Sequence, residues 1–476
     1  MKRILLLFSL VLMTLSTRAT HLMGGDLVVQ KDTAGVYQIT LSLYRDILGI
    51  PLANPEYVDM YFWNSSTNSY QFSQTLYINY NGALSTALLP NFPYGVEVGI
   101  YTYPLSGLPA GKYRFVYYTC CRNGAIQNMS QPLNESMPLY TDLEVTSGAS
   151  NSTPGCLAMP VAYFPVNSPA TYNPLPYDPD ADSISWNLNT PIGNYTNTGG
   201  TPIFTPVVGF TAPPAAASGP FTMNAITGEI TWTPNATGNF VQSFEVKEFR
   251  NGVEIGSIIR DMQYVVIAPD TNSHPPAFVT SSPFMTNTAE KYKYIYYTPG
   301  QPVSFTIGGN DQDAGTNLQL QSFGTVYQLP VPATFTTSGS GTSISGTFQW
   351  TPPANFNQDM IVLFRLRDNI FTKDFTLLLR RNPTAIVEMQ HIVGNVNVFP
   401  NPAKDKLHIA MDLKQDVNGS VSLYSSLGQK VKTFYTGRMP KGSFRIDEDI
   451  NLAPGLYFLA VTGEDKSVHT QAVVIQ

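Results

Sequence analysis

At residues 227–234 the chain reads TGEITWTP, and at residues 346–352 it reads GTFQWTP. In each stretch a glycine stands four residues before a tryptophan that is followed by Thr-Pro. An acidic loop lies upstream of each stretch, and a strand-like run that ends in a carboxylate lies downstream. The same order of motifs twice in one chain predicts two tandem repeats, at residues 156–268 and 277–382.

The composition favours strands over helices. The 476 residues include 36 glycines, 37 prolines, 27 tyrosines and 26 phenylalanines, and turn residues combined with aromatics are typical of short strands joined by tight turns. Apolar and polar residues alternate over residues 37–43, which predicts a half-buried strand. The sequence therefore predicts an all-β fold of tandem β-sandwich domains.

The predicted domains follow one another along the chain. A segment rich in serine, asparagine, glycine and proline near residue 150 separates an N-terminal β-sandwich domain, residues 20–150, from the first repeat. His-Pro-Pro at residues 274–276 joins the two repeats, and a linker at residues 382–395 precedes a C-terminal domain at residues 395–476. Four β-sandwich domains in a row suit the length of the chain.

The two repeats resemble the immunoglobulin-like and cadherin-like modules of bacterial surface proteins. The resemblance rests on the Asp-x-Asp loop and on the Gly-x-x-x-Trp-x-Pro turn; the second repeat lacks the third aspartate and has Asn317 nearby. It implies that the repeats act as a stiff spacer. Trp232 and Trp350 occupy the same place in their repeats, so we expect them to pack in the cores rather than to stack on sugars.

The acidic loops and the strand-end carboxylates are the best candidates for a metal site. The residues concerned are Asp178, Asp180, Asp182 and Glu248 in the first repeat, and Asp311, Asp313 and Asp368 in the second. Alternating carboxylates can converge on Ca²⁺, which takes six to eight oxygen ligands. The alternative is that these residues form hydrogen-bonded turns, which aspartate favours.

Residues 1–19 have the pattern of a signal peptide. Lys2 and Arg3 precede a short apolar run, and cleavage after Ala19 would follow a small-residue motif. Removing this segment takes the formal net charge from −6 to −9, because three of its residues are basic. A mildly acidic mature chain argues against nucleic acid as a partner.

Three cysteines are present, and export would allow them to form a disulfide. We expect Cys156 to pair with either Cys120 or Cys121. A bridge between the adjacent Cys120 and Cys121 is less favoured because it is strained.

The last 80 residues carry several short motifs in a fixed order. The diagnostic positions are Pro400, Asn401, Pro402, Gly428, Gly455 and Tyr457, and a terminal apolar strand follows. The segment resembles the C-terminal sorting domain of cargo for the type IX secretion system. The resemblance implies recognition by the outer-membrane secretion machinery and a location outside the cell or on the outer-membrane surface. The lysine that usually precedes the last strand is absent, and His469 lies there instead.

The N-terminal region contains His-Leu-Met-Gly-Gly-Asp at residues 21–26 and Cys-Cys-Arg-Asn at residues 120–123. It resembles the opening domain of large secreted surface proteins of Bacteroidetes. No catalytic motif accompanies it: the closest two histidines, His391 and His408, are 17 residues apart, and no nucleophile elbow or phosphate loop is present. We therefore expect no enzymatic activity.

Two functions compete. The favoured one is a secreted or cell-surface structural or adhesion protein, whose partner is a glycan or a cell-surface protein. The alternative is a polysaccharide-binding protein or a non-catalytic accessory to a carbohydrate-degrading system. The tyrosine-rich segments at residues 57–80 and 101–118 form either a binding face or ordinary cross-strand pairs, and we favour the pairs. An exposed aromatic row on the N-terminal domain would favour polysaccharide binding.

Overall fold

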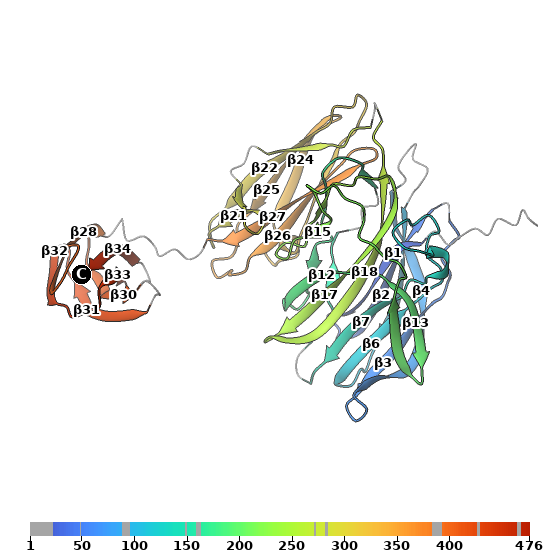
Figure 1. The fold of residues 1–476 in the computed structure, drawn as a ribbon, viewed down its shortest axis with the longest axis horizontal. Helices are drawn as coiled ribbons and strands as arrows, with labels where there is room; N and C mark the ends of the chain where they lie inside the picture. Colours follow the sequence, from blue (N-terminus) through green and yellow to red (C-terminus); the bar gives the residue numbers. More distant parts are fainter. Residues whose placement is uncertain are drawn as a thin grey trace, which may run out of the picture. The chain divides into compact units, whose positions relative to one another are not determined.

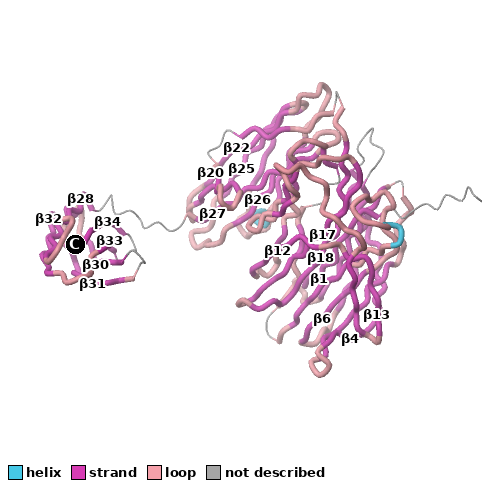
Figure 2. Tube along the Cα trace, in the orientation of Figure 1, coloured by secondary structure: helices cyan, strands magenta, loops and turns pink. Residues whose placement is uncertain are grey.

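The computed structural model describes residues 22–47, 49–87, 96–147, 150–158, 163–270, 273–280, 284–382, 393–425, 429–463 and 468–476. The chain forms two compact units, residues 1–380 and 381–476. Nearly all regular structure is β-strand, with two short 3₁₀ turns, η1 (Pro132–Asn134) and η2 (Thr325–Tyr327) (Figure 2). Within the described residues, no helix has the length and apolarity needed to cross a membrane. The predicted signal peptide lies outside the described residues.

A ring of eight antiparallel strands forms the N-terminal part of the first unit. Figure 1 shows several of these strands lying side by side. In order, these strands are β1 (Leu22–Lys31), β2 (Tyr37–Asp46), β5 (Val96–Leu105), β4 (Ser69–Ala87), β3 (Glu56–Asn64), β6 (Gly111–Tyr117), β7 (Leu139–Val145) and β18 (Val253–Ile267). β7 and β1 pair with successive segments of β18, which closes the ring. Alternate residues of β2 are buried, as the sequence pattern predicts, and pack into one apolar core.

Strand β18 also belongs to the first repeat. It forms a long hairpin with β17 (Gly238–Arg250), which pairs with β12 (Ser183–Asn189). Smaller elements complete this repeat: β8 (Gly155–Cys156), β9 (Tyr163–Pro165), β10 (Ala170–Tyr172), β11 (Pro176–Tyr177), β13 (Ile192–Thr198), β14 (Thr201–Pro206), β15 (Thr222–Met223) and β16 (Ile230–Trp232). One continuous sheet therefore runs through the first two predicted domains, whose boundaries stay a prediction.

A close backbone approach makes this shared sheet possible. Gly24 of β1 pairs with Met262 of β18, and a Cβ atom at Gly24 would lie 2.1 Å from the carbonyl oxygen of Asp261. Only glycine fits there without displacing backbone. This close contact explains why a glycine stands at residue 24 in the His-Leu-Met-Gly-Gly-Asp motif.

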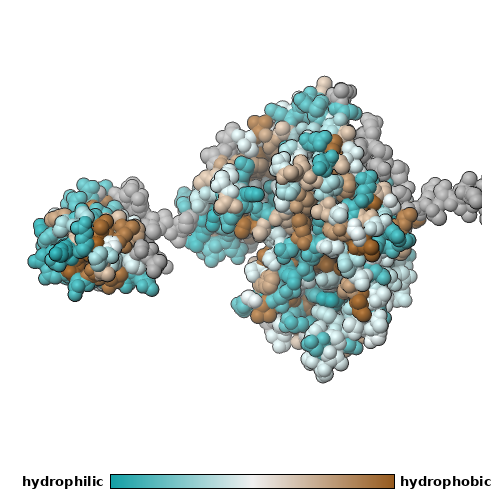
Figure 3. All heavy atoms as spheres, in the orientation of Figure 1, coloured by the Kyte–Doolittle hydropathy of each residue, from teal (hydrophilic) through white to brown (hydrophobic). Residues whose placement is uncertain are grey.

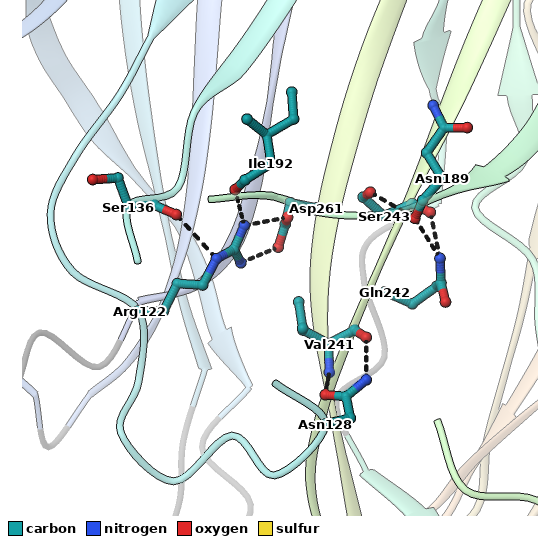
Figure 4. Close-up of polar contacts among 9 residues, drawn as sticks. All are labelled: Arg122, Asn128, Ser136, Asn189, Ile192, Val241, Gln242, Ser243 and Asp261. Carbon is teal, nitrogen blue, oxygen red and sulfur yellow. Dashed lines mark hydrogen bonds and ion pairs between the residues drawn. The ribbon is translucent and has the colours of Figure 1, made fainter. Parts of the chain in front are cut away.

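Buried polar groups tie the loop after β6 to the same hairpin (Figure 4). The guanidinium of Arg122 donates two hydrogen bonds to the carboxylate of Asp261, at 2.9 and 2.8 Å, and further bonds to the carbonyls of Ser136 and Ile192. Asn128 exchanges two hydrogen bonds with the backbone of Val241 in β17. Since Arg122 and Asp261 are both nearly inaccessible, removing either partner would leave a buried charge.

The second repeat is a sandwich of two sheets. One contains β19 (Ala277–Thr280), β22 (Val303–Asn310), β25 (Ser343–Trp350) and β24 (Thr334–Ser340). The other contains β20 (Met285–Asn287), β21 (Tyr292–Tyr297), β27 (Thr372–Arg381), β26 (Met360–Arg367) and β23 (Gln319–Phe323). Trp232 and Trp350 are each 3% exposed and lie in the cores of their repeats, as expected.

The second unit is a smaller sandwich with its own core. One sheet contains β28 (Val393–Phe399), β29 (Lys406–Leu413) and β32 (Gly442–Asp449); the other contains β31 (Lys430–Met439), β30 (Val417–Ser425), β33 (Gly455–Gly463) and β34 (Val468–Ile475). The fold class is therefore all-β with tandem sandwiches, as predicted. The face drawn in Figure 3 mixes hydrophilic residues with small, separate hydrophobic patches.

Candidate functional sites

The predicted sorting residues meet at the last strand. β34 stands at the end of its sheet and pairs with β33, where Gly455 lies opposite Ile475 and Tyr457 lies opposite Val473. The outer edge of β34 therefore offers backbone groups that β33 does not use. Gly428, which was also predicted as a sorting residue, lies outside the described residues.

The Pro-Asn-Pro segment covers part of that outer edge. The side-chain amide of Asn401 donates to the carbonyl of Ala472 at 3.0 Å and accepts from the N–H of Val474 at 2.8 Å. Ala403 continues the contact through its backbone, which bonds to Val474 and Gln476. Pro400 and Pro402 have no N–H donors, so the asparagine side chain supplies the polar contact between them. Two motifs separated by about 70 residues thus form one site.

The acidic loop of the first repeat is held by protein groups. The carboxylate of Asp178 accepts the N–H groups of Asp180 and Asp182, both at 2.9 Å. Asp180 accepts the N–H of Ser152 at 2.6 Å, and Asp182 forms an ion pair with Arg250. These are the hydrogen-bonded turns of the alternative interpretation, and Arg250 adds a positive charge beside the loop.

Glu248 meets this loop, as the calcium prediction requires. Its side chain is fully buried and accepts a hydrogen bond from Asn151 at 2.7 Å. Burial, together with the neighbouring Asp178, raises the pKa of Glu248 to about 9. Among the described residues, Oε2 of Glu248 and Oδ2 of Asp178 are buried without a hydrogen-bond partner. Two facing carboxyl groups of this kind need a shared proton or a cation, and the raised pKa favours the proton on Glu248 at neutral pH.

The second repeat brings its acids together in a similar way. Asp313 accepts hydrogen bonds from the backbone and ring nitrogens of His274, at 2.5 and 2.7 Å. Burial first, and then the charges of Asp311 and Asp313, raise the pKa of Asp368 to about 6. No cluster of three acidic, histidine or cysteine side chains in the described part of the chain has metal-binding geometry. Calcium binding stays a prediction for both repeats.

The expected cysteine pairing is wrong in this structure. The disulfide joins the adjacent Cys120 and Cys121, and Cys156 is free. Cys156 lies in β8, packed against the core of the first repeat, and burial raises the pKa of its thiol to about 11. Cys120 and Cys121 lie in the loop that Arg122 anchors, so the fold holds this disulfide and the Cys156 thiol in different places.

An aromatic ladder lies on the outer face of β3 and β4. Side chains alternate along β3, so that Val58 and Met60 enter the core while Tyr57, Tyr61 and Trp63 lie on the other face of the sheet. Three cross-strand aromatic pairs follow one another on the outer face: Tyr57–Tyr77, Tyr61–Phe72 and Trp63–Tyr70, with ring centroids 5.1, 5.7 and 5.1 Å apart. The favoured interpretation of these segments, ordinary cross-strand pairing, is thus confirmed for these rings.

One end of the ladder is open to solvent. Tyr57 and Tyr77 are 50% and 58% exposed. Tyr118 is 51% exposed and follows Tyr117, which pairs with the neighbour of Tyr57 in β3. Polar groups adjoin the rings, because Asp59 accepts hydrogen bonds from Thr75 at 2.6 Å and from Tyr195 at 2.8 Å. We call Tyr57, Tyr77 and Tyr118, with Asp59, the tyrosine surface.

A pocket of about 680 Å³ adjoins the acidic loop of the first repeat. Asp178, Asp182 and Asp359 line it. Asp182 pairs with Arg250 and Asp359 pairs with Arg380. A glycoside hydrolase needs one carboxyl as acid and another as base or nucleophile, and two of these three carboxylates are each paired with an arginine.

Residues 397–476 match the family model described as secretion system C-terminal sorting domain. The chain is therefore a secreted protein that carries a type IX sorting domain, and it is located outside the cell or at the cell surface. This confirms the predicted localisation and the secretion machinery as a partner.

No curated protein matches the chain. Among solved structures, domains A168–A170 of titin match at 9% identity over 68% of this chain and 97% of that chain, with a TM-score of 0.17. A Bacteroides ovatus protein of a mixed-linkage glucan utilization locus, SGBP-B, matches at 13% identity over 68% of this chain and 70% of that one, with a TM-score of 0.14. Latent PorU from Porphyromonas gingivalis matches at 12% identity over 79% and 35%, with a TM-score of 0.15. These low TM-scores carry no argument about ligands.

Proposed function

We propose that this exported protein binds extracellular polysaccharide through the tyrosine surface. The observation that carries the proposal is the exposure of Tyr57 and Tyr77, about half accessible, whose rings pair across β3 and β4. Tyr118, also about half accessible, directly follows β6, the strand beside β3. A tyrosine ring is amphipathic, so its face can pack against the C–H groups of a sugar while its hydroxyl stays solvated. Asp59 supplies a polar group beside the rings.

The proposal departs from the function that the sequence favoured, a structural or adhesion protein. Both share an exported chain with a stiff spacer. The joint between the repeats supports the spacer role, because Arg365 pairs with the buried Asp374, and Asp374 also accepts the backbone N–H of Asn173 in the first repeat. An adhesion role that uses a glycan as its anchor would combine the two. We propose no catalytic activity.

The test is binding of the full chain to a panel of polysaccharides, measured by affinity electrophoresis. The double variant Tyr57→Ala/Tyr77→Ala should lose binding by tenfold or more, because aromatic anchors dominate such interfaces. Tyr80→Ala is the matched control: Tyr80 is also exposed and lies on β4, but its ring packs on Tyr101 of β5. Equal binding by the double variant and the control would refute the proposal.

A further inference from the structure

A second pocket, of about 530 Å³, lies where the first repeat meets the second within the first unit. β19, β20, β21 and β27 of the second repeat line one side, and Thr171, Thr227 and Glu229 of the first repeat line the other. It shares no residue with the tyrosine surface or with the sorting site. The pocket carries positive side chains, which is unusual for a chain with a formal net charge of −6.

Three lysines line this pocket: Lys291, Lys293 and Lys373. None forms an ion pair with a carboxylate in the part of the chain that the structure describes. Lys373 is half-buried, and this burial lowers the pKa of its ammonium group. A desolvated ammonium group without a counter-charge is costly, and a bound anion would remove that cost.

The acids in the pocket do not cancel this charge. Asp374 is buried and accepts two hydrogen bonds from the guanidinium of Arg365, both at 2.8 Å, so its charge is already balanced. Glu229 accepts the N–H of Thr376 at 3.2 Å. Burial, with the nearby Asp374, raises its pKa to about 7, although the charge of Lys293 acts in the opposite direction. Glu229 is therefore only partly ionised near pH 7 and offsets at most part of the charge of Lys293. Near neutral pH the pocket therefore holds an excess of positive charge.

The rest of the lining suits a sugar ring. Phe278 and Phe375 lie with their ring centroids 5.5 Å apart, and Thr286 and Thr288 line the same pocket. Apolar rings beside a few polar groups are the usual lining of a small-molecule site, and the volume is within the usual range.

We propose that this pocket binds the carboxylate or sulfate group of an acidic sugar. The lysines hold the anion, with Lys373 as the buried contact, and the aromatic rings and threonines contact the sugar. The proposal goes beyond the tyrosine surface and does not depend on it. A cation is unsuited to the pocket, because the lysines would repel it.

The test is isothermal titration calorimetry of the full chain with digalacturonate, with neutral digalactose and with inorganic sulfate. Digalacturonate should bind, digalactose should bind at least tenfold more weakly, and sulfate should compete with digalacturonate. Lys373→Met should weaken digalacturonate binding by tenfold or more, the usual effect of losing a hydrogen bond to a charged group. Lys404→Met, a change of an exposed lysine in the second unit, is the control and should bind as the wild type does.

Two outcomes would overturn the proposal: no binding of digalacturonate by the wild type, or equal binding by the wild type and Lys373→Met. Should Lys373→Met fail to fold, Lys293→Met at an exposed position decides the question in the same assay. The Tyr57→Ala/Tyr77→Ala variant should keep full digalacturonate binding, which separates failure of this pocket from failure of the tyrosine surface.

Discussion

Strands β18 and β34 are each the last strand of a sandwich in chain order, but the fold uses their edges in opposite ways. β18 is hydrogen-bonded along both edges, to β17 on one side and to β7 and β1 on the other. β34 pairs with β33 on one edge and leaves its other edge to a few contacts from residues 401–403. The difference shows what the second edge of a strand contributes: a paired edge adds to stability, whereas an edge left largely open stays available to a partner.

The largest expected effect comes from breaking the anchor of β18. Asp261→Asn leaves the guanidinium of Arg122 buried without its counter-charge, and we expect a loss of about 3–5 kcal/mol in the free energy of unfolding of the first unit. Urea unfolding followed by fluorescence would measure it. Asp416→Asn breaks an exposed pair with Arg438 in the second unit and should change stability little. Equal effects of the two variants would contradict the assigned role of the buried pair.

The sequence could predict what is local and not what is distant. The alternation at residues 37–43 predicted a strand, and the Trp-Thr-Pro stretches predicted two buried tryptophans, because both signals lie within a few residues. The pairing of Gly24 with Met262 joins residues more than 200 positions apart, and no local pattern specifies which strand edges will meet. A glycine pair in a strand was the available signal, since it marks close backbone approach.

The candidate sites likewise divide into those that the sequence could predict and those that it could not. Glu248 could be placed near Asp178 because the two repeats show the same order of motifs. The cysteine pairing depended on where β8 packs, and the tyrosine surface depended on which rings the hairpin of β13 and β14 leaves uncovered, so neither could be predicted. The shared repeat pattern also said nothing about Arg250, whose charge changes the electrostatics of the first acidic loop.

A second prediction concerns Glu248, the buried acid of the β17–β18 hairpin. The pKa of Glu248 is about 9 in the folded chain and about 4.3 in an unfolded one. The folded state therefore holds a proton that the unfolded state releases, so stability falls as the pH rises from about 4.3 to 9. Glu248→Gln keeps the shape and removes this loss, and we expect it to raise the free energy of unfolding at pH 8 by about 1–2 kcal/mol. A destabilised variant at pH 8 in chelator would contradict the shared proton.

A smaller effect is expected at β34, where Asn401→Ala removes two hydrogen bonds and leaves the sheet intact. The loss should be about 1–2 kcal/mol for the second unit, and the amount of chain exported should fall because the outer edge of β34 is no longer held. Immunoblots of medium, surface and periplasm would measure export. Asn418→Ala, at an exposed position in β30, is the control, and normal export of Asn401→Ala would show that this edge contact is not part of the sorting signal.

The smallest expected effect is a shift in melting temperature on adding calcium, which tests the calcium prediction. The two acidic loops differ in the positive groups that lie beside them. In the first repeat Arg250 forms an ion pair with Asp182 and opposes a cation, whereas in the second repeat the ion-pair partner of the acidic loop is His274, whose charge depends on protonation, and Arg367 lies next to Asp368. If extracellular-type sites are present, calcium at about 1–10 mM should raise the melting temperature by a few degrees. Glu248→Gln should abolish any shift that arises in the first repeat, and Asp368→Asn any shift that arises in the second. A wild type that melts at the same temperature in calcium and in chelator would leave both loops as hydrogen-bonded turns, with Glu248 and Asp178 held together by a proton.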